Sequence, residues 1–145
     1  MTVDEALREA VNREVIHGEQ ALTSARALRD LGMCNDSLSR LYYAVFHFAA
    51  ALLLTEGVEP RRYRALPGLL LSHLGSAGFD ASDAARVARL STYRDMADYE
   101  RAFDATADVV ADALNDAVAF VDKARACLRA RGALDESSSM EPRKS

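Results

Sequence analysis

The feature that most constrains the fold is one long apolar run, Leu41 to Leu54, broken only by His47. Neither Gly nor Pro interrupts the run, and its apolar residues cover every side of a helix. A helix that is apolar all round is normally buried, so the pattern predicts a central helix over about residues 37–57. The run is too short to cross a membrane, which takes about 20 apolar residues. Other elements must therefore cover it.

The rest of the chain predicts more helices to surround this one. Apolar residues recur at helical spacing over residues 3–32, 81–100 and 104–131, and a short apolar stretch covers 66–76. Residues 35–37 offer an N-cap to the central helix, and Ser82 or Asp80 offers one to the helix over 81–100. Gly18 lies inside the first of these segments, and its missing side chain suggests a close neighbour there. No alternation typical of strands is visible. The sequence predicts an all-α up-and-down bundle of about five helices.

Composition is consistent with one folded domain. The chain has 145 residues with only 7 Gly and 3 Pro, and we expect residues 1–132 to form the bundle and 133–145 a disordered polar tail. The net charge of −4 argues against binding long duplex DNA by bulk electrostatics, although a local basic groove is compatible with it.

Two cysteines make no disulfide framework. The first residues lack the apolar core of a signal peptide, so we expect a cytoplasmic protein away from membranes.

One arginine occupies a position that apolar residues normally take. Arg94 continues the spacing of Val87 and Leu90, which predicts that it points into the core. A buried guanidinium must be paired, and Asp98, four residues on, is the nearest local partner, followed by Tyr99 with its hydroxyl. A structural salt bridge inside the bundle and a functional arginine in a groove both fit this pattern.

A second group lies on the predicted helix 37–57. Arg40, Tyr43 and His47 share one face of it. Histidine suits proton transfer near neutral pH, and arginine holds phosphate by paired hydrogen bonds. Together they suit attack of a ribose 2′-hydroxyl on the next phosphate, which needs no metal. The alternative is a core histidine that bonds a tyrosine or a backbone carbonyl.

The sequence predicts no metal site and no cofactor. Glu14 and His17 have the ExxH spacing of di-metal bundles, but neither His47 nor His73 has a glutamate three residues before it. No Walker loop, GxGxxG motif or plausible Ser-His-Asp order occurs.

Two segments resemble the HEPN family. Residues 40–53, from Arg40 through Tyr42-Tyr43-Ala44 and His47 to Leu52-Leu53, are similar to its RxYYAxFHxxxALL helix. Residues 94–99, Arg94 to Tyr99, resemble its RxxADY segment, and Phe120-Val121 matches a pair in its last helix. The resemblance covers about residues 5–130.

The resemblance implies a fold and a range of functions. HEPN domains are helical bundles that commonly dimerise, with functional residues facing a groove at the dimer interface. Many are metal-independent ribonucleases, and many small ones are encoded beside a minimal nucleotidyltransferase as toxin–antitoxin or defence pairs. The implied site has Arg94, His47 and Arg40 in catalytic roles, with substrate- or nucleotide-binding residues Tyr43, Asp98 and Tyr99.

The chain departs from the nuclease branches at one position. Those branches carry arginine and histidine together on the later helix, whereas here Tyr99 stands in place of that histidine and none follows His73. One hypothesis is a toxin or defence component that acts on RNA, with His47 reaching across the groove. A second is a non-catalytic HEPN partner that binds a nucleotidyltransferase or a nucleotide. A third is a helical interaction protein whose Arg94–Asp98 pair is structural.

Overall fold

Five α-helices make up the fold in a computed structural model that describes residues 2–60 and 63–134. They are α1 (Val3–Asp30), α2 (Cys34–Leu54), α3 (Leu66–Leu74), α4 (Ala81–Tyr99) and α5 (Ala107–Ala130), with short 3-10 turns at Tyr63–Ala65 and Gly75–Ala77. No strand occurs within the described ranges. The all-α bundle predicted from the sequence is confirmed.

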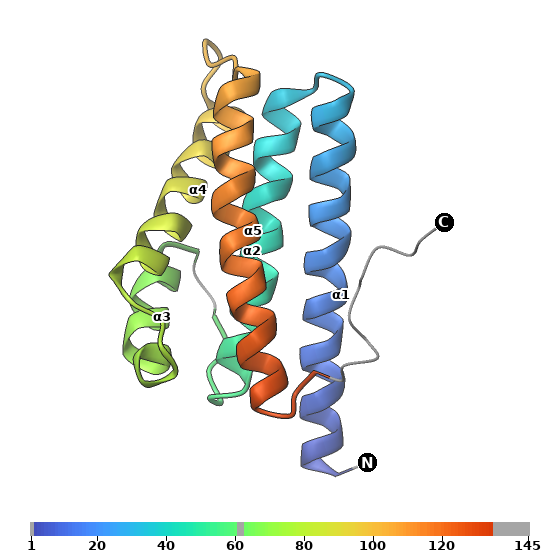
Figure 1. Cartoon of the computed structure of the whole chain (residues 1–145), viewed down its shortest axis with the longest axis vertical. Coiled ribbons are helices and arrows are strands. Elements are labelled where there is room, and N and C mark those ends of the chain that lie inside the picture. Colours follow the sequence, from blue (N-terminus) through green and yellow to red (C-terminus); the bar gives the residue numbers. More distant parts are fainter. Residues whose placement is uncertain (1, 61–62, 135–145) are drawn as a thin grey trace.

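Helix α2 lies at the centre of the bundle, as its apolar run predicts. It packs against α1, α3, α4 and α5 (Figure 1). Leu41, Val45, Phe48 and Leu52 are fully buried along its length. Burial of such side chains contributes roughly 1.5–3 kcal/mol each, which makes α2 the main contributor to the core.

The same helix has the length and composition of a membrane span. In the described part of the chain Cys34–Leu54 alone passes that test, and 67% of its apolar window is buried inside the fold. The neighbouring helices therefore account for its apolar character, as in the core helix of a bundle.

Gly18 brings α1 and α2 close together, as the sequence suggested. A Cβ at Gly18 would lie 2.7 Å from Cδ2 of Phe48 and 3.2 Å from the carbonyl oxygen of Ala44. The aromatic ring occupies the space that any side chain at position 18 would need. The glycine is thus required by packing, since it has an ordinary helical backbone with no positive φ.

The start of α2 differs from the prediction. The sequence places an N-cap within residues 35–37, but the helix begins at Cys34 with Met33 as a cap that makes no side-chain hydrogen bond. Asn35 instead donates to the carbonyl of Phe103 and accepts from the amide of Ala105, both at 2.9 Å. The side chain that favours a helix cap is used here to hold the loop between α4 and α5.

Helix α4 begins as the sequence predicts. The Asp80 side chain accepts from the amides of Ser82 and Asp83, and the Asp83 side chain accepts from the amide of Asp80. This capping box satisfies amides that have no partner inside the helix.

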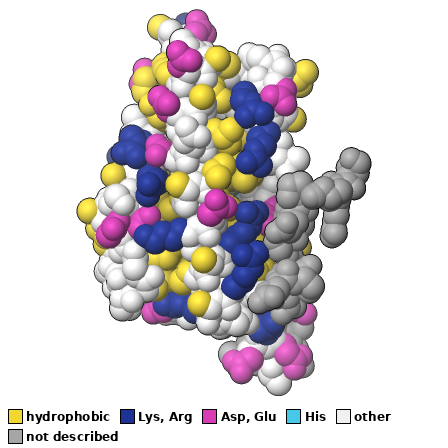
Figure 2. Space-filling model, in the orientation of Figure 1, with side chains coloured by type: hydrophobic (Ala, Val, Ile, Leu, Met, Phe, Trp, Pro, Cys, Tyr) yellow, Lys and Arg dark blue, Asp and Glu magenta, His cyan; other side chains and the backbone are white. Residues whose placement is uncertain are grey.

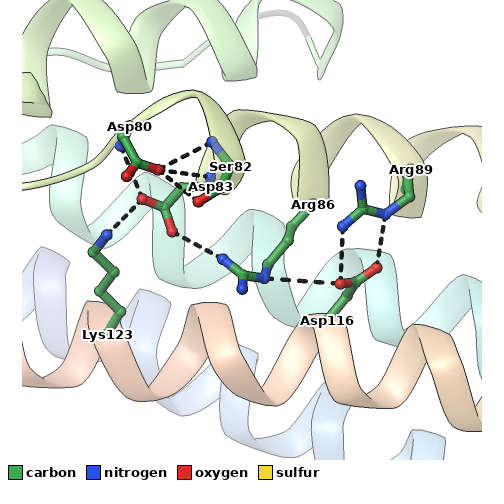
Figure 3. A network of polar contacts seen from close by, with 7 residues as sticks. All are labelled: Asp80, Ser82, Asp83, Arg86, Arg89, Asp116 and Lys123. Atoms are coloured by element: carbon green, nitrogen blue, oxygen red, sulfur yellow. Dashed lines mark hydrogen bonds and ion pairs between the residues drawn. The ribbon is translucent and has the colours of Figure 1, made fainter.

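An ion-pair network then joins α4 to α5 (Figure 3). Asp83, whose side chain is 1% exposed, pairs with Lys123 at 2.6 Å and with Arg86 at 3.3 Å. Asp116 on α5 pairs with Arg86 at 3.8 Å and accepts two 3.0 Å hydrogen bonds from Arg89. The buried carboxylate is balanced, and the network fixes the register of the two helices.

The packed bundle continues just past α5. Leu134 is 4% exposed and belongs to the hydrophobic core. The tail predicted over 133–145 therefore begins with a packed residue, and its remainder, residues 135–145, lies outside the described residues.

Candidate functional site

Arg94 points into the bundle, as its spacing predicts. It is 8% exposed on α4. Its Nη1 donates to the hydroxyl of Tyr43 at 3.2 Å, and its guanidinium carbon lies 5.1 Å from the ring centre of Tyr42. Contacts between a cation and aromatic faces of this kind partly replace the water that burial removes.

The charge partner of Arg94 is Asp95, so the predicted pairing with Asp98 is wrong. Nη2 of Arg94 lies 3.0 Å from a carboxylate oxygen of Asp95. Asp98 instead accepts a hydrogen bond of 3.2 Å from Ser39 on α2. The packing of α4 on α2 turns Asp98 towards the neighbouring helix, which spacing along α4 alone does not show.

Electrostatics keep Arg94 ionised. Burial by itself lowers its pKa, but the interactions with Tyr43 and Asp95 outweigh this effect and raise the pKa above its ordinary value. A fixed positive charge at the base of a surface site suits a phosphate or another anion.

Two more predicted residues complete an arginine–tyrosine cluster, defined as Arg40, Tyr43, Arg94 and Tyr99. The Arg40 guanidinium lies 4.8 Å from the Tyr43 ring centre, so both arginines contact this one ring. Tyr99 lies 5.9 Å from the Arg94 guanidinium carbon and is 74% exposed. The cluster therefore has a buried cation at its base and an exposed ring at its edge.

His47 lies beside a carboxylate that the sequence analysis did not connect with it. Nδ1 of His47 is 2.8 Å from a carboxylate oxygen of Glu14 on α1, and both side chains are about a quarter exposed, at 25% and 30%. His17 packs edge-on against His47, with ring centres 5.3 Å apart. The sequence signal at Glu14 is its ExxH spacing to His17, which is typical of di-metal bundles and does not predict a pair with His47.

The Glu14 contact determines how His47 can act. A carboxylate at Nδ1 favours the tautomer with the hydrogen on Nδ1, which leaves the lone pair of Nε2 available for proton transfer. No set of three His, Cys, Asp or Glu side chains suited to a metal occurs among residues 2–60 and 63–134.

The two parts of the site are neighbours on α2, and no hydrogen bond or ion pair among the described residues joins His47 to the arginine–tyrosine cluster. Tyr43 and His47 are four residues apart, so they share a face about 6 Å from each other along the helix. No contact between His47 and Arg94 is present in the described part of the chain. The structure thus gathers Arg40, Tyr43, Arg94 and Tyr99, places His47 one turn away, and leaves Asp98 at the rim on Ser39.

Comparisons with known proteins place the chain in a family. The family model of the HEPN domain matches residues 15–127, a span that includes His47 and the arginine–tyrosine cluster and begins one residue after Glu14. A UPF0332 protein of Pyrococcus horikoshii is 38% identical over 71 residues, which are 49% of this chain and 50% of the relative. A UPF0332 protein of Archaeoglobus fulgidus is 28% identical over 107 residues, 74% of this chain and 86% of the relative.

A third relative has a name that refers to function. A Methanocaldococcus jannaschii protein named "Putative toxin MJ0605" is 35% identical over 57 residues, which are 39% of this chain and 42% of the relative. The chain thus matches about half the length or less of the Pyrococcus and Methanocaldococcus relatives. The family model covers well over half of the present chain, and the chain belongs to the HEPN family.

Proposed function

We propose that this chain is a toxin-type HEPN protein that binds RNA at the arginine–tyrosine cluster and cleaves it without a metal. The observation that carries the proposal is the placement of a Glu14-held imidazole one helical turn from an arginine pair that shares the Tyr43 ring. The similarity to the toxin-named relative supports the toxin role.

Each part of the site has a chemical task. Arg40 and Arg94 hold a phosphate, and the exposed Tyr99 ring offers a stacking surface to a base. Nε2 of His47 accepts the proton of the ribose 2′-hydroxyl. The 2′-oxygen then bonds to phosphorus, the bond from phosphorus to the 5′-oxygen breaks, and the leaving oxygen takes a proton from water. The products are a 2′,3′-cyclic phosphate and a free 5′-hydroxyl.

A homodimer is part of the proposal. The HEPN family resemblance supports it, since it implies a functional groove between two copies, and a second copy would bring another arginine–tyrosine cluster to the same surface. In this dimer, His47 of each protomer would act together with the arginine pair of the same protomer, which lies one helical turn away.

The test is RNA cleavage in the presence of EDTA. We expect wild-type protein to cut tRNA or mRNA, and His47→Ala to reduce the rate by roughly 10²–10⁴-fold, the usual contribution of a general base. Arg94→Ala should also abolish cleavage. Glu14→Gln should lower the rate less than His47→Ala, since it leaves the imidazole present.

Two controls keep the test decisive. His73→Ala removes a half-buried histidine of α3 that lies outside the site, and it should cleave at the wild-type rate. Because Arg94 is buried, its alanine variant must be shown to fold by circular dichroism, and the exposed Tyr99→Ala gives a second measure of the cluster. Cleavage that survives His47→Ala would overturn the assigned chemistry.

A specific observation favours a second function. Arg94 is 8% exposed and already bonded to Asp95 and Tyr43, as expected for a cluster that positions a ligand and does not react with it. In that case the chain is a non-catalytic HEPN protein that binds a nucleotidyltransferase or a nucleotide. Folded wild-type protein that never cleaves RNA, but retains a nucleotidyltransferase in a pull-down that Tyr99→Ala abolishes, would establish this function.

A further inference from the structure

A row of arginines lies on the side of α1 that faces α5. The two helices are linked by an ion pair of 2.8 Å between Glu19, 5% exposed, and Arg125. Arg26 follows Glu19 by two helical turns and Arg8 precedes it by three, so both share its face of α1. Arg8 donates to the carbonyl of Gly132, just after α5, which confirms that it points this way.

Helix α5 contributes the other side of the row. Arg129 follows Arg125 by one turn, so the two lie on neighbouring positions of one face. We call Arg8, Arg26, Arg125 and Arg129 the arginine seam. Figure 2 shows dark-blue side chains gathered in a column where α1 and α5 meet, with a few acidic side chains beside it.

Two arginines of the seam carry positive charges that no acidic side chain of the described residues neutralises. Arg125 is neutralised by Glu19, lies 3.8 Å from a carboxylate oxygen of the exposed Asp122 and lies 5.3 Å from the ring centre of Phe48. Arg26 and Arg129 have no acidic partner within ion-pair distance among the described residues. Two guanidinium groups without an acidic partner, on either side of a buried ion pair in one row, offer a local site for an anion.

The seam is separate from the site described above. Glu14 precedes Glu19 by five residues, which is a rotation of about 140° around α1. The Glu14–His47 pair and the arginine seam therefore face different sides of the same helix. A ligand on the seam would leave the arginine–tyrosine cluster open.

We propose that the arginine seam is a second RNA-binding surface, which holds the phosphate backbone of a single strand. Arg8 and Arg26 are separated by about 27 Å along α1, so the row offers contacts to several successive phosphates and suits a linear polyanion. Arginine presents a planar fork of donors that matches phosphate oxygens. The choice of RNA over an acidic protein segment rests on the proposed function.

The test measures binding without cleavage. The probe is a fluorescent oligouridylate of about 12 nucleotides with 2′-O-methyl sugars, which lack the attacking hydroxyl, and affinity is followed by anisotropy over a range of salt concentrations. Arg26→Ala/Arg129→Ala should weaken binding on the order of tenfold at about 0.1 M salt and lower the salt slope by about 1.4, since each phosphate contact on a single strand contributes about 0.7. Neither substitution removes the partner of a buried charge, so the double variant should fold.

The matched control removes two arginines from elsewhere. Arg13 lies about 120° from Glu19 on α1, and Arg64 lies beside α3; both are exposed and without an ion pair in the described part of the chain. Arg13→Ala/Arg64→Ala should keep the affinity within about twofold. Equal losses in the two double variants, or no loss in the first, would overturn the proposal.

Other outcomes separate the seam from the cleavage site. Binding of polyglutamate that depends on Arg26 and Arg129, with no binding of the RNA probe, would overturn the RNA assignment in favour of an acidic protein. Seam-dependent RNA binding with no cleavage of natural RNA would support the seam and count against the nuclease. If the Arg26→Ala/Arg129→Ala variant cleaves RNA and binds the probe as wild type does, the result would support the nuclease and count against the seam.

Discussion

At the scale of single residues, this fold depends on positions where a side chain is absent or unusual. Gly18 admits the ring of Phe48 between α1 and α2, and Arg94 occupies a core position that its aromatic neighbours make tolerable. Both positions were visible in the sequence as exceptions to the helical pattern. What surrounds each of them was not.

Gly18→Ala should destabilise the protein by up to about 2 kcal/mol. The new Cβ would lie 2.7 Å from a buried ring and 3.2 Å from a backbone oxygen, and overpacking of this kind costs roughly 1–3 kcal/mol. The better helix propensity of alanine returns about 1 kcal/mol of this. Urea denaturation measures the free energy of unfolding.

Gly68→Ala is the matched control, because no atom lies within 4 Å of a Cβ built there. We expect this variant to be as stable as wild type or slightly more so. A Gly18→Ala protein that matched the Gly68→Ala protein in stability would show that Phe48 moves aside without cost.

At the scale of elements, the two helix starts show when a capping pattern can be trusted. Asp80 caps α4 as its sequence predicts, since Ser82 and Asp83 supply local partners. Asn35 is drawn away from the start of α2 by the loop at Phe103 and Ala105. A cap is predictable when no tertiary partner competes for the same side chain.

The cap of α4 should make stability sensitive to acid. A hydrogen bond from the Ser82 side chain and one from the Asp83 amide lower the pKa of Asp80 from 3.8 to about 2. A lowered pKa in the folded state stabilises the protein above pH 3.8, and this contribution is lost as the pH falls from about 4 to about 2. Denaturation across this pH range measures the effect.

Asp80→Asn is the control for the acid effect, because asparagine caps a helix but does not ionise. The variant should retain most of its stability at pH 7 and lose less than wild type on acidification. An identical acid dependence in the two proteins would contradict the role of Asp80.

At the scale of the whole molecule, the site is built by three helices, the consecutive α1 and α2 and the more distant α4. Helix α1 contributes Glu14, α2 contributes Arg40, Tyr43 and His47, and α4 contributes Arg94. The apolar run of α2 makes this possible, since it places one helix in contact with both of the others. Exposed Tyr99 at the edge of the same surface gives a position from which to test assembly.

We expect light scattering at micromolar concentration to give a mass twice that of the 15.8 kDa chain. Tyr99→Arg should shift the protein towards monomer, because it adds a charge at the surface that we propose as the dimer interface. Leu71→Arg, at a 43% exposed position on α3, should leave the mass unchanged. A wild-type mass of 15.8 kDa would contradict the dimer and the shared groove.

The sequence by itself determined the helices, the central place of α2 and the inward direction of Arg94, because these follow from local periodicity along one chain. It also indicated that Arg40, Tyr43 and His47 share a face of one helix. Only the tertiary structure decided the partners: Asp95 and not Asp98 for Arg94, Glu14 for His47, and the α4–α5 loop for Asn35. Partner choice depends on the distance and rotation between helices, and the spacing of residues within one helix carries no record of either.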